Sequence, residues 1–260
     1  KGGADFFQNR AEKGSGSKAI AHQKAVQEAA DARALADDAA RTDDTIRLAL
    51  PETTVPRGKD VLRLRVGEAV LSVVGPERIR LTGDNGAGKS TLLSFALTSA
   101  EPGIPFLRDV SVELAPTVPT GLLAQNLDGL DQFPTALGAV RDAAPGRTPH
   151  EARALLARFL IRGDRADQAP STMSGGERFR VALARTLFAD PAPQLLVLDE
   201  PTNNIDLASA EQLVAALDDY RGALLIVTHD EHLARDLRVE RLWEVTKKDH
   251  ILKVVDNLAG

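Results

Sequence analysis

The sequence contains no cysteine, which excludes a disulfide framework and a thiolate metal site. No run of about 18 apolar residues occurs, so we do not expect the protein to be embedded in a membrane. Aromatic residues make up only 4% of the chain, and the formal net charge of −5 argues against a globally basic nucleic-acid-binding protein. The lack of cysteine agrees with a reducing compartment, and we expect a globular protein of the cytoplasm.

The clearest pattern in the chain is a glycine-rich stretch between a strand-like and a helix-like segment. It fits the phosphate-binding pattern G-x-x-x-x-G-K-[ST] and consists of Gly83, Asp84, Asn85, Gly86, Ala87, Gly88, Lys89, Ser90 and Thr91. Glycines let backbone N–H groups turn inward around phosphate oxygens, and the start of a helix favours negative charge. Lys89 would then reach the β- and γ-phosphates of a nucleotide, and the Ser90 hydroxyl would bind Mg²⁺.

The residues before this stretch divide into two parts. Residues 17–41 are rich in alanine with few large apolar side chains, as in a long helix with a thin buried face. Two interpretations of that helix stay open, namely a solvated linker and a helix that contacts a large partner. The folded domain is expected over 45–260, and it opens with three segments that predict short antiparallel strands, at 45–50, 61–66 and 69–74.

Apolar strands alternate with amphipathic helices over the rest of the domain. Residues 195–198 and 223–227 are unbroken apolar runs, typical of strands buried on both faces of a parallel sheet. Helices are expected at 151–161 and 211–217, and a helical subdomain over about 126–172. The sequence therefore predicts an α/β fold with a mixed, mostly parallel central sheet, whose ligand site lies along the carboxyl ends of the strands.

Polar side chains follow these strands. Asp199 and Glu200 come after the first apolar run, where one carboxylate can enter a Mg²⁺ shell and the other can polarise an attacking water. His229 follows the second run; a lone histidine there is more often structural, but beside the other groups it could contact a γ-phosphate. Gln125, at the end of a strand-like segment, could bind the metal or the water through its carbonyl oxygen.

A second glycine-containing stretch opens a strongly helical segment. Ser174, Gly175, Gly176 and Glu177 offer a hydroxyl and two glycines at a helix N-terminus, which is one form of an anion-binding site. The alternative is an ordinary capped helix start, with Ser174 as the cap.

Together these motifs resemble the nucleotide-binding domain of the ATP-binding-cassette (ABC) superfamily over residues 45–245. The resemblance rests on the order GDNGAGKST, Gln125, MSGGE, LLVLDE, NNID and His229. It implies a P-loop NTPase fold with a small antiparallel β subdomain and a helical signature subdomain, and an ATPase that uses ATP and Mg²⁺. Two such domains sandwich two ATP molecules in this family, so residues 174–177 would bind the ATP held by a second cassette.

The resemblance also implies a role for each motif. Residues 83–91 would be the Walker A loop, and residues 203–206 the D-loop. The implied catalytic residues are Glu200 as the base, His229 as the switch histidine and Gln125 of the Q-loop. The implied Mg²⁺ ligands are Ser90, Gln125 and Asp199.

One stretch indicates a subfamily. Residues 201–206, PTNNID, are similar to the PTNHLD stretch of ABC-F proteins, although Asn204 replaces the usual His and Ile205 the usual Leu. Because a helical linker joins two cassettes in that subfamily, residues 1–44 would be part of the linker and 45–260 the C-terminal cassette. ABC-F proteins act on the ribosome in translation, and some protect it from antibiotics. The resemblance therefore implies contacts with the ribosome, its rRNA or tRNA through the linker.

Adenine binding departs from the family pattern. Many cassettes stack adenine on an aromatic residue upstream of the Walker A loop, whereas this sequence offers only Leu62, Leu64 and Val66 there. The expectation is that apolar contact alone would hold the base.

Three other interpretations share part of the pattern. The first is the ATPase subunit of a membrane transporter, for example for drug export. The second is a DNA-repair or cohesin-type ATPase, whose halves are usually separated by long coiled coils, but no sustained heptads occur here. The third is a nucleotide-gated binding module with negligible hydrolysis, against which the set Asp199, Glu200 and His229 argues.

Overall fold

The computed structural model describes residues 50–98, 107, 109–203, 205–248 and 251–258. All of them belong to one unit of the chain, Ile46–Gly260. The linker expected over 1–44 lies outside the described residues, and so does Asn204. Of the strand expected at 45–50 only Leu50 is described, and it lies in no strand.

Two sheets form the framework. The smaller is antiparallel in the order β2-β1-β4, built from β1 (Asp60–Val66), β2 (Ala69–Val74) and β4 (Val110–Leu114). The larger has six strands in the order β5-β6-β7-β3-β8-β9, all parallel except the last pair. Its strands are β3 (Arg78–Thr82), β5 (Thr120–Leu123), β6 (Leu195–Asp199), β7 (Ala223–Val227), β8 (Arg241–Lys248) and β9 (Ile251–Leu258). The predicted mixed, mostly parallel sheet and the small antiparallel sheet are both confirmed.

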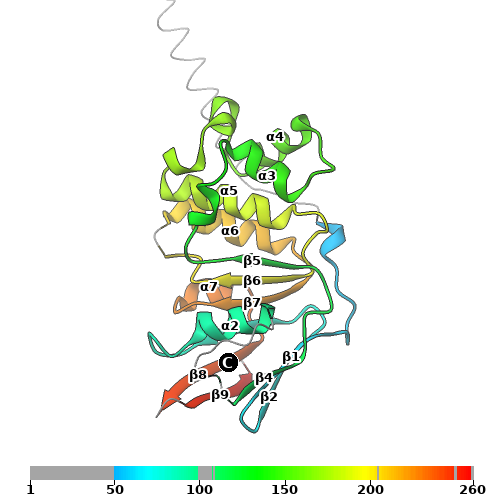
Figure 1. The fold of residues 1–260 in the computed structure, drawn as a ribbon, viewed down its shortest axis with the longest axis vertical. Helices are drawn as coiled ribbons and strands as arrows, with labels where there is room; N and C mark the ends of the chain where they lie inside the picture. The colour runs from blue at the N-terminus through cyan, green and yellow to red at the C-terminus, as the bar shows by residue number, and fades with distance from the viewer. Residues whose placement is uncertain (1–49, 99–106, 108, 204, 249–250, 259–260) are drawn as a thin grey trace, which may run out of the picture. The chain divides into compact units, whose positions relative to one another are not determined.

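Helices cover both faces of the larger sheet (Figure 1). Helix α2 (Lys89–Thr98) packs on the face that also meets the small sheet. The other face carries α5 (Gly175–Leu187), α6 (Leu207–Asp218) and α7 (Glu231–Asp236), with α3 (Ala136–Ala143) and α4 (Pro149–Arg158) packed beyond them. None of the helices in the described part of the chain is long and apolar enough to cross a membrane.

This layering explains the unbroken apolar runs. Every residue of β6 and β7 is buried, and successive residues belong alternately to the two cores. Leu198 and Ile226 lie in the core under α5 to α7, whereas Val197 and Leu225 lie in the core under α2. A strand covered on both faces needs an apolar side chain at each position.

The third central strand, β3, does not follow the solvent-facing alternation that its sequence indicates. Arg80 is only 8% exposed, and Arg78 is partly buried. The guanidinium of Arg78 donates hydrogen bonds to the carbonyl oxygens of Leu217 and Tyr220, near the end of α6, and of Leu237, just after α7. Burial lowers the pKa of Arg78. Arg78 is therefore bonded to the helical layer while partly exposed, and Arg80 is almost fully removed from water.

Helix boundaries also differ from the sequence expectations. The helix expected at 151–161 spans Pro149–Arg158 and begins with a capping box between Thr148 and Glu151. The helix expected at 211–217 begins earlier, at Leu207, because Asp206 caps it by accepting from the Ser209 N–H. The sequence did not indicate α3, whose buried side chains are Ala136, Ala139 and Val140.

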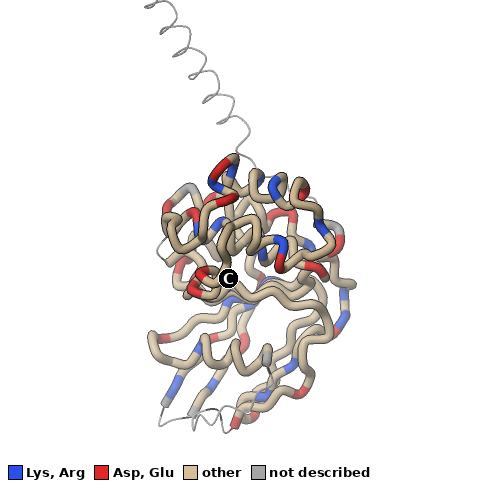
Figure 2. Tube along the Cα trace, turned by 45° about the horizontal axis from the view of Figure 1, so that its top comes forward, with Lys and Arg blue, Asp and Glu red and all other residues tan. Residues whose placement is uncertain are grey.

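Residues 126–172 contain only helices and irregular segments. Their organisation as a separate subdomain stays a prediction. Acidic and basic residues both occur on the helical half and on the sheet half of the described chain (Figure 2).

Because both faces of the sheet are covered, we expect a buried and an exposed leucine to differ widely in how much stability the protein loses when each is replaced by alanine. We expect Leu225→Ala, at a fully buried position, to lower the free energy of unfolding by about 2–5 kcal/mol, because it leaves a cavity in the core under α2. The matched change Leu207→Ala removes a side chain that is 77% exposed and should cost less than about 0.5 kcal/mol. Urea unfolding midpoints of the two variants measure this difference, and equal losses would contradict the described core.

Candidate active site

The candidate residues meet at the carboxyl ends of three neighbouring strands. Strand β7 lies between β6 and β3, with Asp199 paired to Val227 and Leu81 paired to the same residue from the other side. The glycine loop follows β3, Asp199 and Glu200 end or follow β6, and His229 follows β7. Adjacent parallel strands thus bring side chains from distant parts of the sequence to one edge.

The glycine loop begins at a position where only glycine fits. Gly83 has a φ of +141°, and a Cβ there would lie 2.1 Å from the carbonyl oxygen of Val245. Gly86 and Gly88 also have positive φ values. Helix α2 starts directly after the loop, at Lys89. The loop therefore has the backbone form and the helix start that a phosphate site needs.

Lys89 is almost fully buried and bonds within the site. Its Nζ donates to the carbonyl oxygens of Gly83, at 2.6 Å, and Asp84, at 3.1 Å, and lies 3.2 Å from Nε2 of His229. A lysine ammonium has three N–H donors, and the two carbonyl oxygens take two of them. The third N–H is therefore available for a phosphate oxygen.

His229 also contacts the proposed base. Its Nε2 lies 3.4 Å from Oε1 of Glu200, and the His229 side chain is 50% exposed. Glu200 has a φ of 47°, which is uncommon for a residue with a side chain, while its N–H donates to the carbonyl of Val227. Such a conformation is held only by surrounding structure. Lys89, His229 and Glu200 therefore form a group of neighbouring side chains at this edge of the sheet.

The residues expected to bind Mg²⁺ have suitable chemistry but form no complete protein site. Oδ1 of Asp199 is buried and has no hydrogen-bond partner among the described residues. Ser90 and Gln125 are exposed at the same edge. Within the described ranges no group of three or more acidic, histidine or cysteine residues could hold a metal by itself. This fits Mg²⁺, which usually takes one or two protein oxygens together with substrate phosphates and waters.

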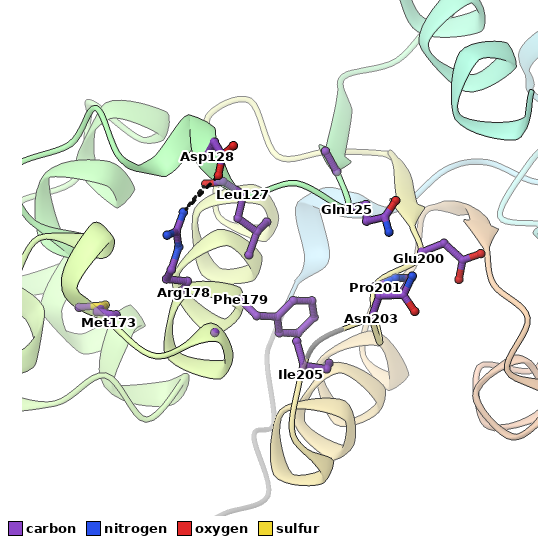
Figure 3. A pocket seen from close by; sticks show the side chains of 12 residues that line it. Gln125, Leu127, Asp128, Met173, Arg178, Phe179, Glu200, Pro201, Asn203 and Ile205 are labelled. Atoms are coloured by element: carbon purple, nitrogen blue, oxygen red, sulfur yellow. Dashed lines mark hydrogen bonds and ion pairs between the residues drawn. The ribbon is translucent and has the colours of Figure 1, made fainter. Parts of the chain in front are cut away.

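A cavity of about 370 Å³ connects this edge with the helical layer. Gln125 and Glu200 line one end, and Met173 lines the other (Figure 3). Phe179 and Ile205 provide apolar walls between them. Gln125 and Glu200 therefore line one shared space, which also reaches Gly175 of the second glycine stretch.

Ser174 is a helix cap, as one of the two interpretations had it. Its Oγ accepts from the N–H of Glu177 and donates to Oε2 of Glu177, at 3.0 Å, while that carboxylate also accepts from the Ser174 N–H. The backbone hydrogen bond from Ser174 is the main reason why the pKa of Glu177 is lowered. Both Ser174 and Gly175 are exposed, so the start of α5 is open to a second molecule.

Gly176 has a packing role that its sequence context did not indicate. It is buried, and a Cβ there would lie 2.8 Å from Oδ2 of Asp206 and 2.9 Å from Oγ of Ser209. Asp206 caps α6 through Ser209, and this contact lowers the pKa of Asp206. The glycine therefore allows α5 to pack closely against the start of α6.

Two further findings modify the sequence analysis. Leu62, Leu64 and Val66 are at most 3% exposed and belong to the core, so these side chains are not available to hold adenine by apolar contact. Arg80, which the motif search did not single out, contacts the segment that carries His229. A charged residue within a short apolar strand is the signal that could have found it.

Comparisons of the sequence with known proteins agree with the motifs. A family model described as "ABC transporter" matches residues 68–203. The probable ATP-binding protein YheS of Haemophilus influenzae is 41% identical over 179 residues, which are 68% of this chain and 27% of that protein. Human ATP-binding cassette sub-family F member 3 is 36% identical over 167 residues, or 64% and 22% of the two chains. The chain thus spans about a quarter of the length of these curated relatives.

Solved structures support the fold. The ATP-binding subunit of an ABC transporter matches with a TM-score of 0.59 and 19% identity, covering 76% of this chain and 90% of that one. A dimeric ATP-binding cassette in a post-hydrolysis state, bound to ADP and phosphate, matches with a TM-score of 0.51 and 21% identity, covering 80% and 99%. At these identities the likeness concerns the fold.

The close packing at Gly176 predicts that an added methyl group destabilises the protein there but not at an uncrowded glycine. We expect Gly176→Ala to lower the free energy of unfolding by about 1–3 kcal/mol, because the methyl group would force α5 away from Asp206 and Ser209. Gly129→Ala is the matched control, since nothing lies within 4 Å of an added Cβ there. Thermal unfolding of both variants measures the effect, and an unchanged Gly176→Ala midpoint would show that the two helices do not pack this closely.

Proposed function

Because the chain belongs to the ABC transporter family and is an ATPase domain of the F type, we propose that it hydrolyses ATP together with a second cassette in a protein that works on the ribosome. The observation that carries the catalytic part is the connected group of Lys89, His229 and Glu200 at the edge of the sheet. The whole protein would act in cytoplasmic translation or in protecting the ribosome from antibiotics. The alternative is the ATPase subunit of a membrane transporter.

Binding of the substrate begins at the glycine loop. The backbone N–H groups of residues 83–91 and the ammonium of Lys89 hold the phosphates of ATP, with the N-terminus of α2 adding a favourable dipole. Ser90, Asp199 and Gln125 would hold Mg²⁺, which when bound neutralises negative charge on the β- and γ-phosphates. The buried, unpartnered oxygen of Asp199 supports this assignment.

Hydrolysis then depends on two side chains at neighbouring strand ends. Glu200 orients a water for in-line attack and accepts its proton, and its positive φ points to a backbone held for this purpose. His229, in contact with both Glu200 and Lys89, stabilises charge that develops at the γ-phosphate. Gln125 lines the same cavity as Glu200, where its side chain can sense the occupied site.

The second cassette completes the site. Residues 174–177 are set for this because Ser174 and Gly175 are exposed at the start of α5, whose first N–H groups have no helical partners. One solved cassette of similar fold is a dimer bound to ADP and phosphate, which supports the same arrangement for this chain. The isolated chain should therefore bind ATP but hydrolyse it slowly unless it pairs with itself.

Replacing the proposed base should separate binding from turnover. We expect Glu200→Gln to leave ATP affinity largely unchanged and to lower the hydrolysis rate by about 10²- to 10⁴-fold, because the amide cannot accept the proton of the water. Glu211→Gln, which changes an exposed carboxylate on α6, is the matched control and should hydrolyse ATP normally. Phosphate release and nucleotide titration check both parts, and a wild-type rate in Glu200→Gln would rule out this assignment.

The partner is tested with the full-length protein carrying Glu200→Gln. We expect it to sediment with ribosomes when ATP is present and to remain in the supernatant without ATP, because slow hydrolysis traps the paired cassettes. Lys89→Ala, which removes the phosphate contact, is the control and should not be retained. ATP-independent behaviour together with recovery of a membrane permease would favour the transporter alternative.

A further inference from the structure

One charged side chain interrupts an otherwise apolar row across the central sheet. Leu198 of β6 pairs with Ile226 of β7, which pairs with Arg80 of β3, which pairs with Leu242 of β8. Strand β3 lies in the middle of the sheet, with α7 over this face (Figure 1). At 8% exposure, Arg80 carries a charge where its neighbours carry aliphatic groups, so its partners must compensate for lost hydration.

The partners of Arg80 lie on both sides of His229. Its Nε donates to the carbonyl oxygen of Thr228, at 2.9 Å, and its Nη1 donates to Oε1 of Glu231, at 2.7 Å. Thr228 is 1% exposed and directly precedes His229, whereas Glu231 is the first residue of α7. One planar guanidinium thus connects the strand before the glycine loop with both ends of the short turn that holds His229.

The parallel ladder between β7 and β3 ends at the pair Val227–Leu81, and among the described residues few other contacts fix the turn beyond it. The N–H of Asp230 donates to Oγ1 of Thr228, and Asp230 in turn caps α7. These bonds shape the turn internally but do not attach it to β3. Arg80 makes that attachment from the backbone side, while Lys89 meets the imidazole from the side of the glycine loop.

We propose that Arg80 is a positioning residue for His229, which it holds at the distance that its contacts with Lys89 and Glu200 require. The proposal rests on the catalytic part of the proposed function, since it assumes that His229 acts at the γ-phosphate. Within the part of the chain that the structure describes, Arg80 makes no hydrogen bond or ion pair with Lys89, His229 or Glu200. It acts through the carbonyl of Thr228, one residue away from the imidazole.

Arg78 is the matched control position for Arg80. It lies two residues earlier on β3, and its guanidinium also bonds to backbone carbonyl oxygens inside the helical layer. Its acceptors belong to Leu217, Tyr220 and Leu237, none of which flanks His229. A purely structural contribution should therefore be shared by both arginines, whereas an effect on His229 should belong to Arg80 alone.

Removal of the Arg80 guanidinium should leave a folded protein. Arg80 forms one wall of a cavity of about 270 Å³, which also meets Arg235 and Arg238. Glu231 lines the same cavity and its side chain is already mostly exposed, so only the Thr228 carbonyl loses a buried donor. Methionine keeps the length of the side chain and removes both donors, so Arg80→Met is the informative change, with Arg78→Met as its control.

The test measures steady-state ATP hydrolysis in the full-length protein. We expect Arg80→Met to lower kcat about tenfold with little change in KM, because a displaced imidazole affects turnover more than nucleotide binding. Arg80→Lys should recover only part of the rate, since one ammonium cannot reproduce the fork. Arg78→Met should lower thermal stability without lowering kcat of the folded protein.

A double variant shows whether Arg80 acts through His229. In the background of His229→Ala, Arg80→Met should cause no further loss of kcat, because the residue that it positions is gone. Fully additive losses would overturn the proposal. So would a normal kcat in Arg80→Met beside a slow His229→Ala variant.

A spectroscopic measurement separates this inference from the proposed function. The ring signals of ¹³C-labelled histidine, assigned by their loss in His229→Ala, should shift for His229 in nucleotide-free Arg80→Met and stay unchanged in Arg78→Met. An unchanged His229 signal in Arg80→Met would overturn the positioning role whatever the hydrolysis rate. A shifted signal in a protein that does not hydrolyse ATP would instead overturn the proposed function and leave the Arg80 contact supported.

Discussion

The pairing of β7 with β3 is the constraint on which the candidate site depends. Lys89 and His229 are 140 positions apart in the chain, yet their side-chain nitrogens lie 3.2 Å from each other because both follow strands that are neighbours in the sheet. Glu200 joins them from β6, the next strand along. Since parallel neighbours lie only about 4.8 Å apart, a different strand order would separate these groups by a whole strand width or more.

The same pairing restricts which side chains the interior can hold. A central strand covered on both faces has no side that faces water, so every polar side chain on it needs a partner. Strand β3 carries two arginines; Arg78 is bonded to main-chain carbonyl oxygens at the ends of α6 and α7, and Arg80 to the carbonyl oxygen of Thr228, just after β7. The polar groups that would otherwise weaken the core thus become connections between the sheet and the segments around it. The candidate site and the interior therefore depend on the same packing, because Arg80 is buried in the sheet and also contacts the turn that carries His229.

Sequence reasoning succeeded where local chemistry decides the outcome and failed where a distant partner decides it. The apolar runs of β6 and β7, the glycine loop and the Ser174 cap follow from residue type and spacing within a few positions. The burial of Arg80 does not, because an alternating strand looks the same whether one face or both faces are covered. Helix α3 was missed since its buried face consists mainly of alanines, and the packing role of Gly176 was missed because its neighbours Asp206 and Ser209 come 30 and more positions later.

The capping box at the start of α5 limits how a phosphate could approach it. A serine hydroxyl has one O–H donor, and that of Ser174 is committed to the carboxylate of Glu177. A phosphate oxygen can only accept hydrogen bonds, so it must either take this donor from Glu177 or use the free N–H groups of the first turn. The lowered pKa of Glu177 keeps its carboxylate charged, which opposes a second anion nearby. An anion that accepts from the Ser174 hydroxyl must therefore release it from Glu177, so binding to this hydroxyl and opening of the cap are one event.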